Sequence, residues 1–191
     1  TKRIILMSRR ISILGSTGSI GGNALEVASH LSEELEVVYL SANQNTDLLI
    51  KQALQFNPKA VCIVDEKYSE QVKDALISTE IEVLVGRKCL LELSQRDDID
   101  ILLNGLVGAP GMEPTLMALQ SGIDVALSNK ESLVMAGDII KKTMEKSGAK
   151  LYPVDSEHSA IWQCLVGEEI EDIRRLILTG SGGPFLSLIH I

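Results

Sequence analysis

The chain has 191 residues, of which 45% are hydrophobic and only 3% aromatic, and its formal net charge is −8 at pH 7. This length and apolar content permit a sizeable aliphatic core and suit one domain, or one domain with part of another. The acidic balance excludes nucleic acid as the main partner, because phosphate backbones are bound by clustered Lys and Arg. No apolar run reaches the ~18 residues that predict a membrane helix, so no membrane partner is expected.

The three cysteines, at positions 62, 89 and 164, are odd in number and form no C-x-x-C pair. A disulfide framework or a zinc site is therefore not predicted, and a reducing, cytoplasmic compartment fits best. Cys62 lies in the apolar run AVCIV and is interpreted as a core residue rather than a nucleophile. Residues 1–10 are interpreted as an N-terminal extension that is too short for a signal peptide with a cleavage site.

Short apolar runs alternate with longer amphipathic ones along the chain. Strands are predicted at residues 11–15, 35–41, 60–65, 81–86, 100–106, 124–128, 150–154 and 174–180. Helices are predicted after the first strand and at residues 45–56, 69–79, 112–122 and 131–148, the last ending at Gly148. Strands alternating with helices predict the α/β class with a Rossmann-like, mostly parallel, doubly wound sheet, in which the early strands are buried on both faces.

The stretch ILGSTGSIGGNAL joins the first strand to the first helix through a G-x-x-G-x-x-G turn. No Gly-Lys-Ser/Thr follows, so the turn is not a P-loop. In a strand–turn–helix setting, Gly15 would allow the tight turn, Gly18 the approach of a pyrophosphate, and Gly21 close packing of the helix. Backbone N–H groups at the helix start and the hydroxyls of Thr17 and Ser19 would then donate to phosphates. The alternative is a tight turn without a ligand.

The residues after the second strand favour NADP(H) over NAD(H). A site for NAD usually has an Asp or Glu at the end of this strand, where it accepts from the ribose 2′-OH. Here Glu36 stands at the other end of the strand, and amide side chains follow the strand instead, at Asn43, Gln44 and Asn45. An ordinary polar loop in which Asn45 caps the next helix is the alternative, and both interpretations can hold together.

Two further polar stretches follow predicted strands, and in a parallel sheet such positions lie at the edge where ligands bind. LSNKESLV places Asn129, Lys130 and Glu131 at a helix start, where Lys130 could hold a substrate phosphate or hydroxyl. The alternative is a solvated helix N-terminus with Glu131 complementing the helix dipole.

The stretch YPVDSEHSAIWQ has Asp155 and Glu157 separated by one residue. In an extended segment both carboxylates would lie on one face and could share Mg²⁺ or Mn²⁺. The alternative is a helix start, in which Asp155 caps the helix and Glu157 complements the helix dipole. His158 is interpreted as a hydrogen-bonding or packing residue. The stretch LTGSGGPF, which contains Ser181, could hold a phosphate by backbone amides or could be a turn.

The stretches ILGSTGSIG, SNKESLV, PVDSEHSAIWQ and LTGSGGPF, in this order, resemble the family of 1-deoxy-D-xylulose 5-phosphate reductoisomerases. The similarity runs from about Ile11 to Phe185. It implies an NADPH- and metal-dependent enzyme of non-mevalonate isoprenoid biosynthesis. Such an enzyme isomerises 1-deoxy-D-xylulose 5-phosphate and reduces the resulting aldehyde, which gives 2-C-methyl-D-erythritol 4-phosphate. The intact protein is expected to be a homodimer.

The resemblance also assigns roles to individual residues. The predicted coenzyme contacts are Thr17, Gly18, Ser19, Ile20, Asn43, Gln44, Asn45, Asn129 and Glu131. The predicted substrate contacts are Lys130, Ser156, Glu157 and Ser181. Asp155 and Glu157 would be two of three metal-binding carboxylates, and with Lys130 they form the predicted catalytic set.

The chain departs from the family pattern in two places. Gln44 stands where members often have Lys or Arg, and a neutral amide is a weaker clamp on a 2′-phosphate than a cation. The chain also stops before the family's third metal carboxylate, so we expect it to lack turnover by itself. The domains predicted on this basis are an NADPH-binding domain over 11–150, the truncated start of an α+β catalytic domain over 151–185, and a non-family tail over 186–191.

Three other functions fit the sequence less well. A short-chain dehydrogenase or sugar-nucleotide epimerase requires Tyr-x-x-x-Lys, but residues 43, 72 and 156, four after each tyrosine, are Asn, Val and Ser. An aspartate-semialdehyde-type dehydrogenase requires a nucleophilic cysteine in a polar site, and none of the three cysteines is well placed. A stand-alone NADP-binding module is the remaining alternative, and metal binding would distinguish it from the reductoisomerase.

Overall fold

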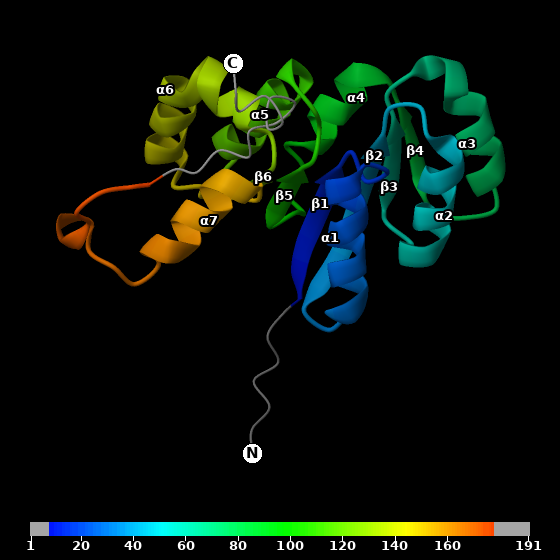
Figure 1. The fold of residues 1–191 in the computed structure, drawn as a ribbon. Helices are drawn as coiled ribbons and strands as arrows, with labels where there is room; N and C mark the ends of the chain where they lie inside the picture. Colours follow the sequence, from blue (N-terminus) through cyan, green and yellow to red (C-terminus); the bar gives the residue numbers. More distant parts are fainter. Residues whose placement is uncertain (1–7, 178–191) are drawn as a thin grey trace, which may run out of the picture. The chain divides into compact units, whose positions relative to one another are not determined.

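A computed structural model describes residues 8–177 of the chain. The chain divides into two compact units, with the division between Asp155 and Ser156. In the first unit, seven parallel strands form one sheet with helices on both faces, which confirms the predicted α/β class and doubly wound sheet (Figure 1).

The strands of the sheet follow the order β4-β3-β2-β1-β5-β6-β7. Their bounds are β1 (Arg9–Leu14), β2 (Leu35–Ala42), β3 (Ala60–Ile63), β4 (Glu82–Val85), β5 (Ile101–Asn104), β6 (Asp124–Leu127) and β7 (Leu151–Pro153). The chain builds outward from β1 to β4 and then returns to place β5 on the other side of β1. The point between β1 and β5 is therefore the topological switch point, where a crevice at the carboxyl ends of the strands accepts ligands.

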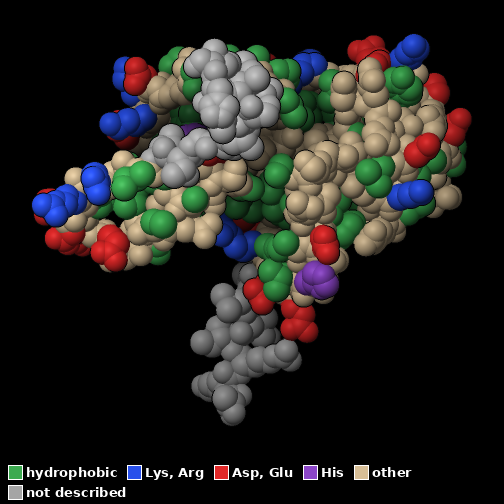
Figure 2. All heavy atoms as spheres, viewed as in Figure 1, with side chains coloured by type: hydrophobic (Ala, Val, Ile, Leu, Met, Phe, Trp, Pro, Cys, Tyr) green, Lys and Arg blue, Asp and Glu red, His purple; other side chains and the backbone are tan. Residues whose placement is uncertain are grey.

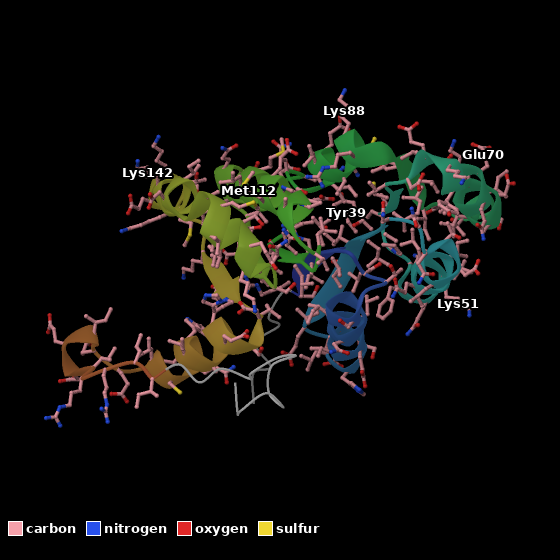
Figure 3. All side chains as sticks on the ribbon, turned by 45° about the horizontal axis from the view of Figure 1, so that its top comes forward. Tyr39, Lys51, Glu70, Lys88, Met112 and Lys142 are labelled. Carbon is pink, nitrogen blue, oxygen red and sulfur yellow. The ribbon has the colours of Figure 1, made fainter. Side chains whose placement is uncertain are left out.

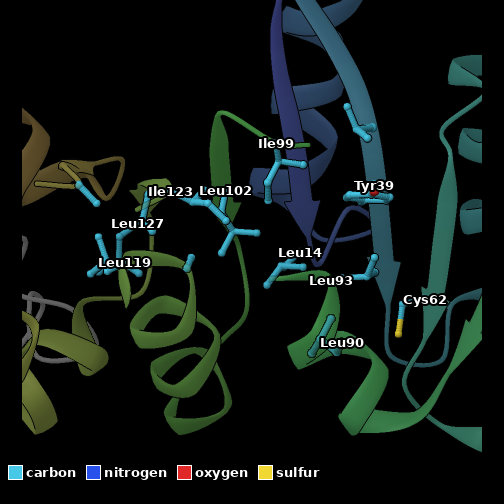
Figure 4. Close-up of a cluster of buried hydrophobic side chains, with 14 of the residues drawn as sticks. Leu14, Tyr39, Cys62, Leu90, Leu93, Ile99, Leu102, Leu119, Ile123 and Leu127 are labelled. Carbon is cyan, nitrogen blue, oxygen red and sulfur yellow. The ribbon is translucent and has the colours of Figure 1, made fainter. Parts of the chain in front are cut away.

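Helices of the first half of the unit cover one face, and helices of the second half cover the other. On the first face lie α1 (Ser19–His30), α2 (Thr46–Phe56) and α3 (Ser69–Leu76), whose buried residues join one core cluster. On the second face lie α4 (Gly86–Leu93), α5 (Met112–Gln120) and α6 (Lys130–Ser147), whose buried residues join the other core cluster (Figure 4). Strands β1 to β3 contribute to both clusters, as near-continuous apolar runs predict.

The helices predicted with bounds agree with the structure to within a few residues. Helix α4 was not predicted, because it begins directly at the end of β4 through Gly86, whose φ of +88° makes the turn without a polar loop. Helix α6 ends at Gly148 in the left-handed conformation, as predicted, but it is interrupted at Ala136, where the backbone is not helical.

Strand β7 lies beyond the predicted domain boundary at residue 150 and pairs with β6, so the compact unit continues to Asp155. The second unit contains α7 (Ser156–Leu165) and the short 3₁₀ helix η3 (Ile170–Asp172). The strand predicted over 174–180 is not formed at residues 174–177, which pair with no strand, and the rest lies outside the described residues. None of the described helices is both long and apolar enough to cross a membrane.

Candidate functional site

The glycine turn lies at the switch point, between the end of β1 and the start of α1. Gly15 has a φ of +74°, a conformation that glycine adopts without steric cost. A methyl group on Gly21 would lie 2.4 Å from the carbonyl oxygen of Gly15, so α1 can approach the turn this closely only with glycine here. The roles predicted for Gly15 in the turn and for Gly21 in helix packing are both confirmed.

Buried polar side chains brace this turn from behind. Ser16 donates from its hydroxyl to Gln52 Oε1 at 2.7 Å, and Gln52 Nε2 donates to the Ser16 carbonyl oxygen at 2.9 Å. On the other side, the Gly15 N–H donates to Ser41 Oγ at 3.1 Å. Gln52 lies on α2 and Ser41 on β2, so the turn is fixed by two elements outside it. The sequence did not identify Gln52, because its partner is 36 residues away.

The N-terminus of α1 has the electrostatic character of an anion site. Its N-cap is Gly18, no side chain caps the helix, and the first turn contains no acidic residue. Gly18 and Ser19 are exposed, and Thr17 and Ile20 are half-buried. Backbone N–H groups and the positive end of the helix dipole are therefore available to a phosphate group at this point. The contacts predicted for these four residues stay predictions.

The loop after β2 is exposed at Asn43, Gln44 and Asn45. Asn45 caps α2, because its Oδ1 accepts from the Leu48 N–H at 3.3 Å, which confirms the alternative interpretation of this residue. Gln44 donates from Nε2 to Asp65 Oδ2 at 3.0 Å. Asp65 follows β3, and sequence spacing alone did not place its carboxylate beside this loop.

A cavity of about 710 Å³ opens next to the same loop. Six of its lining residues are apolar, and two are polar, Asn43 after β2 and Arg87 at the start of α4. The guanidinium of Arg87 donates to the Pro110 carbonyl oxygen at 2.8 Å and pairs with Glu113 at 3.2 Å. An apolar pocket with few polar groups, at the carboxyl edge of the sheet, has the character of a site for a small molecule. The apolar lining residues are Val64, Leu90, Leu106, Val107, Ala109 and Pro110.

Asn104, at the end of β5, is fully buried and holds the loop that follows it. Its Nδ2 donates to the Gly111 carbonyl oxygen at 2.7 Å and to Thr115 Oγ1 at 2.8 Å. Its Oδ1 accepts from the Leu106 N–H at 3.2 Å. The loop at residues 105–111, which forms one wall of the cavity, is thus anchored at both ends by one side chain. No motif in the sequence indicated this role.

Asn129 completes the anchoring of the same loop. It caps α6 by accepting from the Ser132 N–H at 3.0 Å, and its Nδ2 donates to the carbonyl oxygens of Leu106 at 2.8 Å and Gly108 at 2.5 Å. Its side chain is buried, and both ends of the amide are used within the protein. The structure therefore gives Asn129 a loop-holding role, while its contact with a coenzyme stays a prediction.

Lys130 and Glu131 begin α6 and are exposed. They follow β6 at the carboxyl edge of the sheet, two strands from β1, as their position after a predicted strand indicated. Glu131 stands in the first turn of α6, where a carboxylate complements the helix dipole.

The segment with Asp155 and Glu157 is not extended, which corrects the geometry assumed for it. Helix α7 begins at Ser156, so Glu157 lies in the first turn of a helix and the alternation of a strand does not apply. Ser156 Oγ donates to Glu157 Oε2 at 3.1 Å. Within residues 8–177, no group of three or more His, Cys, Asp or Glu is arranged to hold a metal. Ser181 lies outside the described residues.

Comparisons with known proteins agree with this geometry. The family model "1-deoxy-D-xylulose 5-phosphate reductoisomerase" matches residues 11–137, and the model of the C-terminal domain of the same family matches residues 151–190. Relatives of that name from Chloroherpeton thalassium and Halothermothrix orenii are 50% identical over 177 residues and 47% identical over 182 residues. They cover 93% and 95% of this chain.

Solved structures give the same result. The reductoisomerase of Zymomonas mobilis in complex with NADPH superposes with a TM-score of 0.87 at 37% identity, over 93% of this chain and 47% of that one. A reductoisomerase complex with NADPH, fosmidomycin and magnesium superposes with a TM-score of 0.78 at 35% identity, over 82% of this chain and 38% of that one. The chain spans about half the length of the relatives that it matches. It belongs to the 1-deoxy-D-xylulose 5-phosphate reductoisomerase family.

Proposed function

We propose that this chain binds NADPH at the glycine turn and contributes part of the substrate site of a 1-deoxy-D-xylulose 5-phosphate reductoisomerase. The intact enzyme would isomerise this sugar phosphate and reduce the product to 2-C-methyl-D-erythritol 4-phosphate. The observation that carries the proposal is the uncapped start of α1, with Gly15 and Gly21 in close approach, at the switch point of the sheet. The identity of the substrate is inferred from the family to which the chain belongs.

Each part of the proposed site would bind one portion of the coenzyme. The N–H groups at the start of α1 would bind the pyrophosphate, since the first turn contains no carboxylate that would repel it. The cavity beside Asn43 and Arg87 would hold the adenine, and the loop at residues 43–45 would surround the 2′-phosphate. When bound, NADPH supplies the hydride, and the role of the protein is to hold the nicotinamide against the substrate.

The residues after β6 and β7 would bind substrate and metal. Lys130 would hold a substrate phosphate or hydroxyl, and Asp155 and Glu157 would bind Mg²⁺ or Mn²⁺, which take carboxylate oxygens. When bound, the metal polarises the substrate oxygens. Ser156 and Ser181 are proposed as further substrate contacts. The domain assignment, with coenzyme binding up to residue 150 and catalysis beyond it, is part of the same proposal.

A substitution at the start of α1 tests coenzyme binding. Ser19→Asp places a carboxylate beside the proposed pyrophosphate, and we expect NADPH affinity to fall at least about tenfold in a fluorescence titration. The same carboxylate stabilises a helix start, so this loss would not reflect unfolding. Ser29→Asp, near the other end of α1, is the matched control and should leave affinity unchanged. Equal affinity of Ser19→Asp and the unmodified chain would contradict the proposal.

Metal binding distinguishes the reductoisomerase from a stand-alone NADP-binding module. We expect the chain to bind Mn²⁺ and expect Asp155→Asn and Glu157→Gln each to weaken that binding, as followed by the electron paramagnetic resonance signal of free Mn²⁺. Glu168→Gln, an exposed change outside the proposed ligands, should have no effect. Coenzyme binding together with Mn²⁺ binding that ignores both carboxylates would favour the binding module.

A further inference from the structure

We propose that Asp65 sets the coenzyme discrimination of this protein through its hydrogen bond to Gln44, by holding a negative charge at the 2′ position of the adenosine ribose. The inference rests on the dinucleotide site proposed above. It names a residue that neither the glycine motif nor the amide-rich loop indicates, and it predicts a narrower preference for NADPH over NADH than a cation at position 44 would give.

The carboxylate of Asp65 is fixed by contacts on both of its oxygens. Oδ2 accepts from Gln44 Nε2 at 3.0 Å, and Oδ1 accepts from the backbone N–H of Lys67 at 3.1 Å. The backbone N–H of Asp65 donates to the Asn43 carbonyl oxygen at 3.1 Å. The residue is half-buried, so its charge is held in one place beside the exposed loop at residues 43–45.

The sheet brings this carboxylate to the edge where the ribose would lie. β2 and β3 are neighbours, with Ala42 opposite Ile63, so the two strands end side by side. The residues that follow them, Asn43 and Val64, both line the proposed adenine cavity. Asp65 is the next residue after Val64. In dinucleotide-binding folds the ribose 2′ position lies at the end of the second strand, which here is β2.

The charge at this position decides between the two coenzymes. A carboxylate at the end of the second strand accepts from the 2′-OH of NAD, and a cation binds the 2′-phosphate of NADP. In this chain the only carboxylate of the second strand, Glu36, lies at its start, but Asp65, which follows the third strand, is held beside the end of the second strand. One N–H of the Gln44 amide is already donated to it. The pair therefore carries one negative charge, which repels a 2′-phosphate and leaves a 2′-OH unaffected or favoured.

Other charged residues lie near Gln44 and Asp65, but their side chains have other contacts. Asp47 accepts from Gln71 Nε2 at 2.8 Å and is thus directed toward α3. Glu66 lies against Gly86 at the start of α4, where its Oε1 would be 3.2 Å from a methyl group on that glycine. Lys67 contacts Asp65 through its backbone N–H. Among these, Asp65 is the carboxylate whose oxygen contacts the 43–45 loop.

Parallel fluorescence titrations of the 191-residue chain with NADPH and NADH test the inference. Asp65→Asn keeps the shape of the side chain and an oxygen for the Lys67 N–H, but it removes the charge. We expect it to raise the ratio of NADPH affinity to NADH affinity about three- to tenfold, because one unit charge is removed a few ångströms from a phosphate. Gln44→Glu adds a charge at the same place and should lower the ratio by a similar factor.

Asp47→Asn is the matched control, because it makes the same change of charge on a carboxylate that faces α3, and its ratio should stay within about twofold of the unmodified chain. A ratio that Asp65→Asn and Gln44→Glu both leave unchanged, or that Asp47→Asn raises as much as Asp65→Asn does, overturns this inference and leaves the proposed function standing. An unmodified chain that binds neither dinucleotide overturns the proposed function and this inference with it.

Discussion

At the scale of single residues, the environment of each side chain decides what it does. Gly21 and Gly22 are adjacent in α1, yet a methyl group on Gly21 would collide with the Gly15 carbonyl, while one on Gly22 would meet no atom within 4 Å. Cys62 is fully buried, and burial raises the pKa of its thiol to about 12. A thiol with so high a pKa is not a nucleophile at neutral pH, which confirms its interpretation as a core residue.

The glycine pair gives a prediction with an internal control. Gly21→Ala should destabilise the chain by about 1–3 kcal/mol, because the added methyl group pushes α1 away from the glycine turn. Gly22→Ala should be neutral or stabilise the chain by up to about 1 kcal/mol through helix propensity. Urea unfolding followed by circular dichroism measures both. Similar effects of the two substitutions would show that α1 does not pack on the turn as described.

At the scale of elements, a polar network ties the amino-terminal edge of the sheet together. Tyr39 of β2 lies within the sheet, whereas the labelled lysines on the helices point outward (Figure 3). Its hydroxyl donates to Asp98 at 2.7 Å, and Lys59 Nζ lies 2.8 Å from the same carboxylate. The guanidinium of Arg96 lies 5.0 Å from the centre of the Tyr39 ring. This network joins β2 to the residue that precedes β3, Lys59, and to the segment that precedes β5, which contains Arg96 and Asp98.

The network makes stability depend on pH in a defined direction. Burial acts to raise the pKa of Asp98, but hydrogen bonds from Lys59 and Tyr39 outweigh it and the pKa is lowered. The stabilisation is therefore complete above the unfolded pKa of about 3.9, and it is lost as the pH falls through the folded value. Asp98→Asn should cost about 1–3 kcal/mol at pH 7 and progressively less toward pH 3 in urea unfolding.

Asp97 provides the control for this change, because it is the adjacent carboxylate and is exposed. Asp97→Asn should alter the free energy of unfolding by less than about 0.5 kcal/mol at either pH. A cost of Asp98→Asn that stays the same from pH 7 to pH 3 would mean that the charge of Asp98 does not contribute to stability.

At the scale of the whole molecule, the first unit contains both core clusters and all seven strands. On the face drawn in Figure 2, its Lys and Arg side chains occur at separate points among Asp and Glu, and they form no basic patch there. Strand β7 is held to β6 by backbone pairing, and the Val154 N–H donates to the Leu127 carbonyl oxygen at 2.9 Å. The last strand of the sheet thus ends two residues before the proposed metal ligand Asp155.

Truncation tests whether this unit folds by itself. A chain of residues 1–155 should unfold at the same urea concentration as the 191-residue chain and bind NADPH with the same affinity. A chain of residues 1–148, which lacks β7, should unfold at a lower urea concentration, because β6 loses its hydrogen-bonding partner on one side. Loss of folding in the 1–155 chain would show that residues beyond Asp155 belong to the same cooperative unit.

Much of this protein follows from the sequence by itself. The alternation of apolar runs and amphipathic runs determined the α/β class and nearly every element, since hydrophobic periodicity and glycine positions are local properties. The glycine turn, the cap at Asn45 and the end of α6 at Gly148 were read from residues next to one another. The family was identified in the same way, because its motifs are contiguous stretches.

Only the tertiary structure decided which distant groups meet. Gln52 braces the glycine turn from 36 residues away, Asp65 reaches Gln44 across 21 residues, and Asn129 holds the loop after β5 across 21 to 23 residues. The order of the strands in the sheet determines which of these residues come into contact, and that order cannot be predicted from local sequence patterns. The sequence left two interpretations of Asp155 and Glu157 open, an extended segment and a helix start, because a helix start and the end of a strand both favour polar residues; the structure shows the helix start, with Glu157 in the first turn of α7.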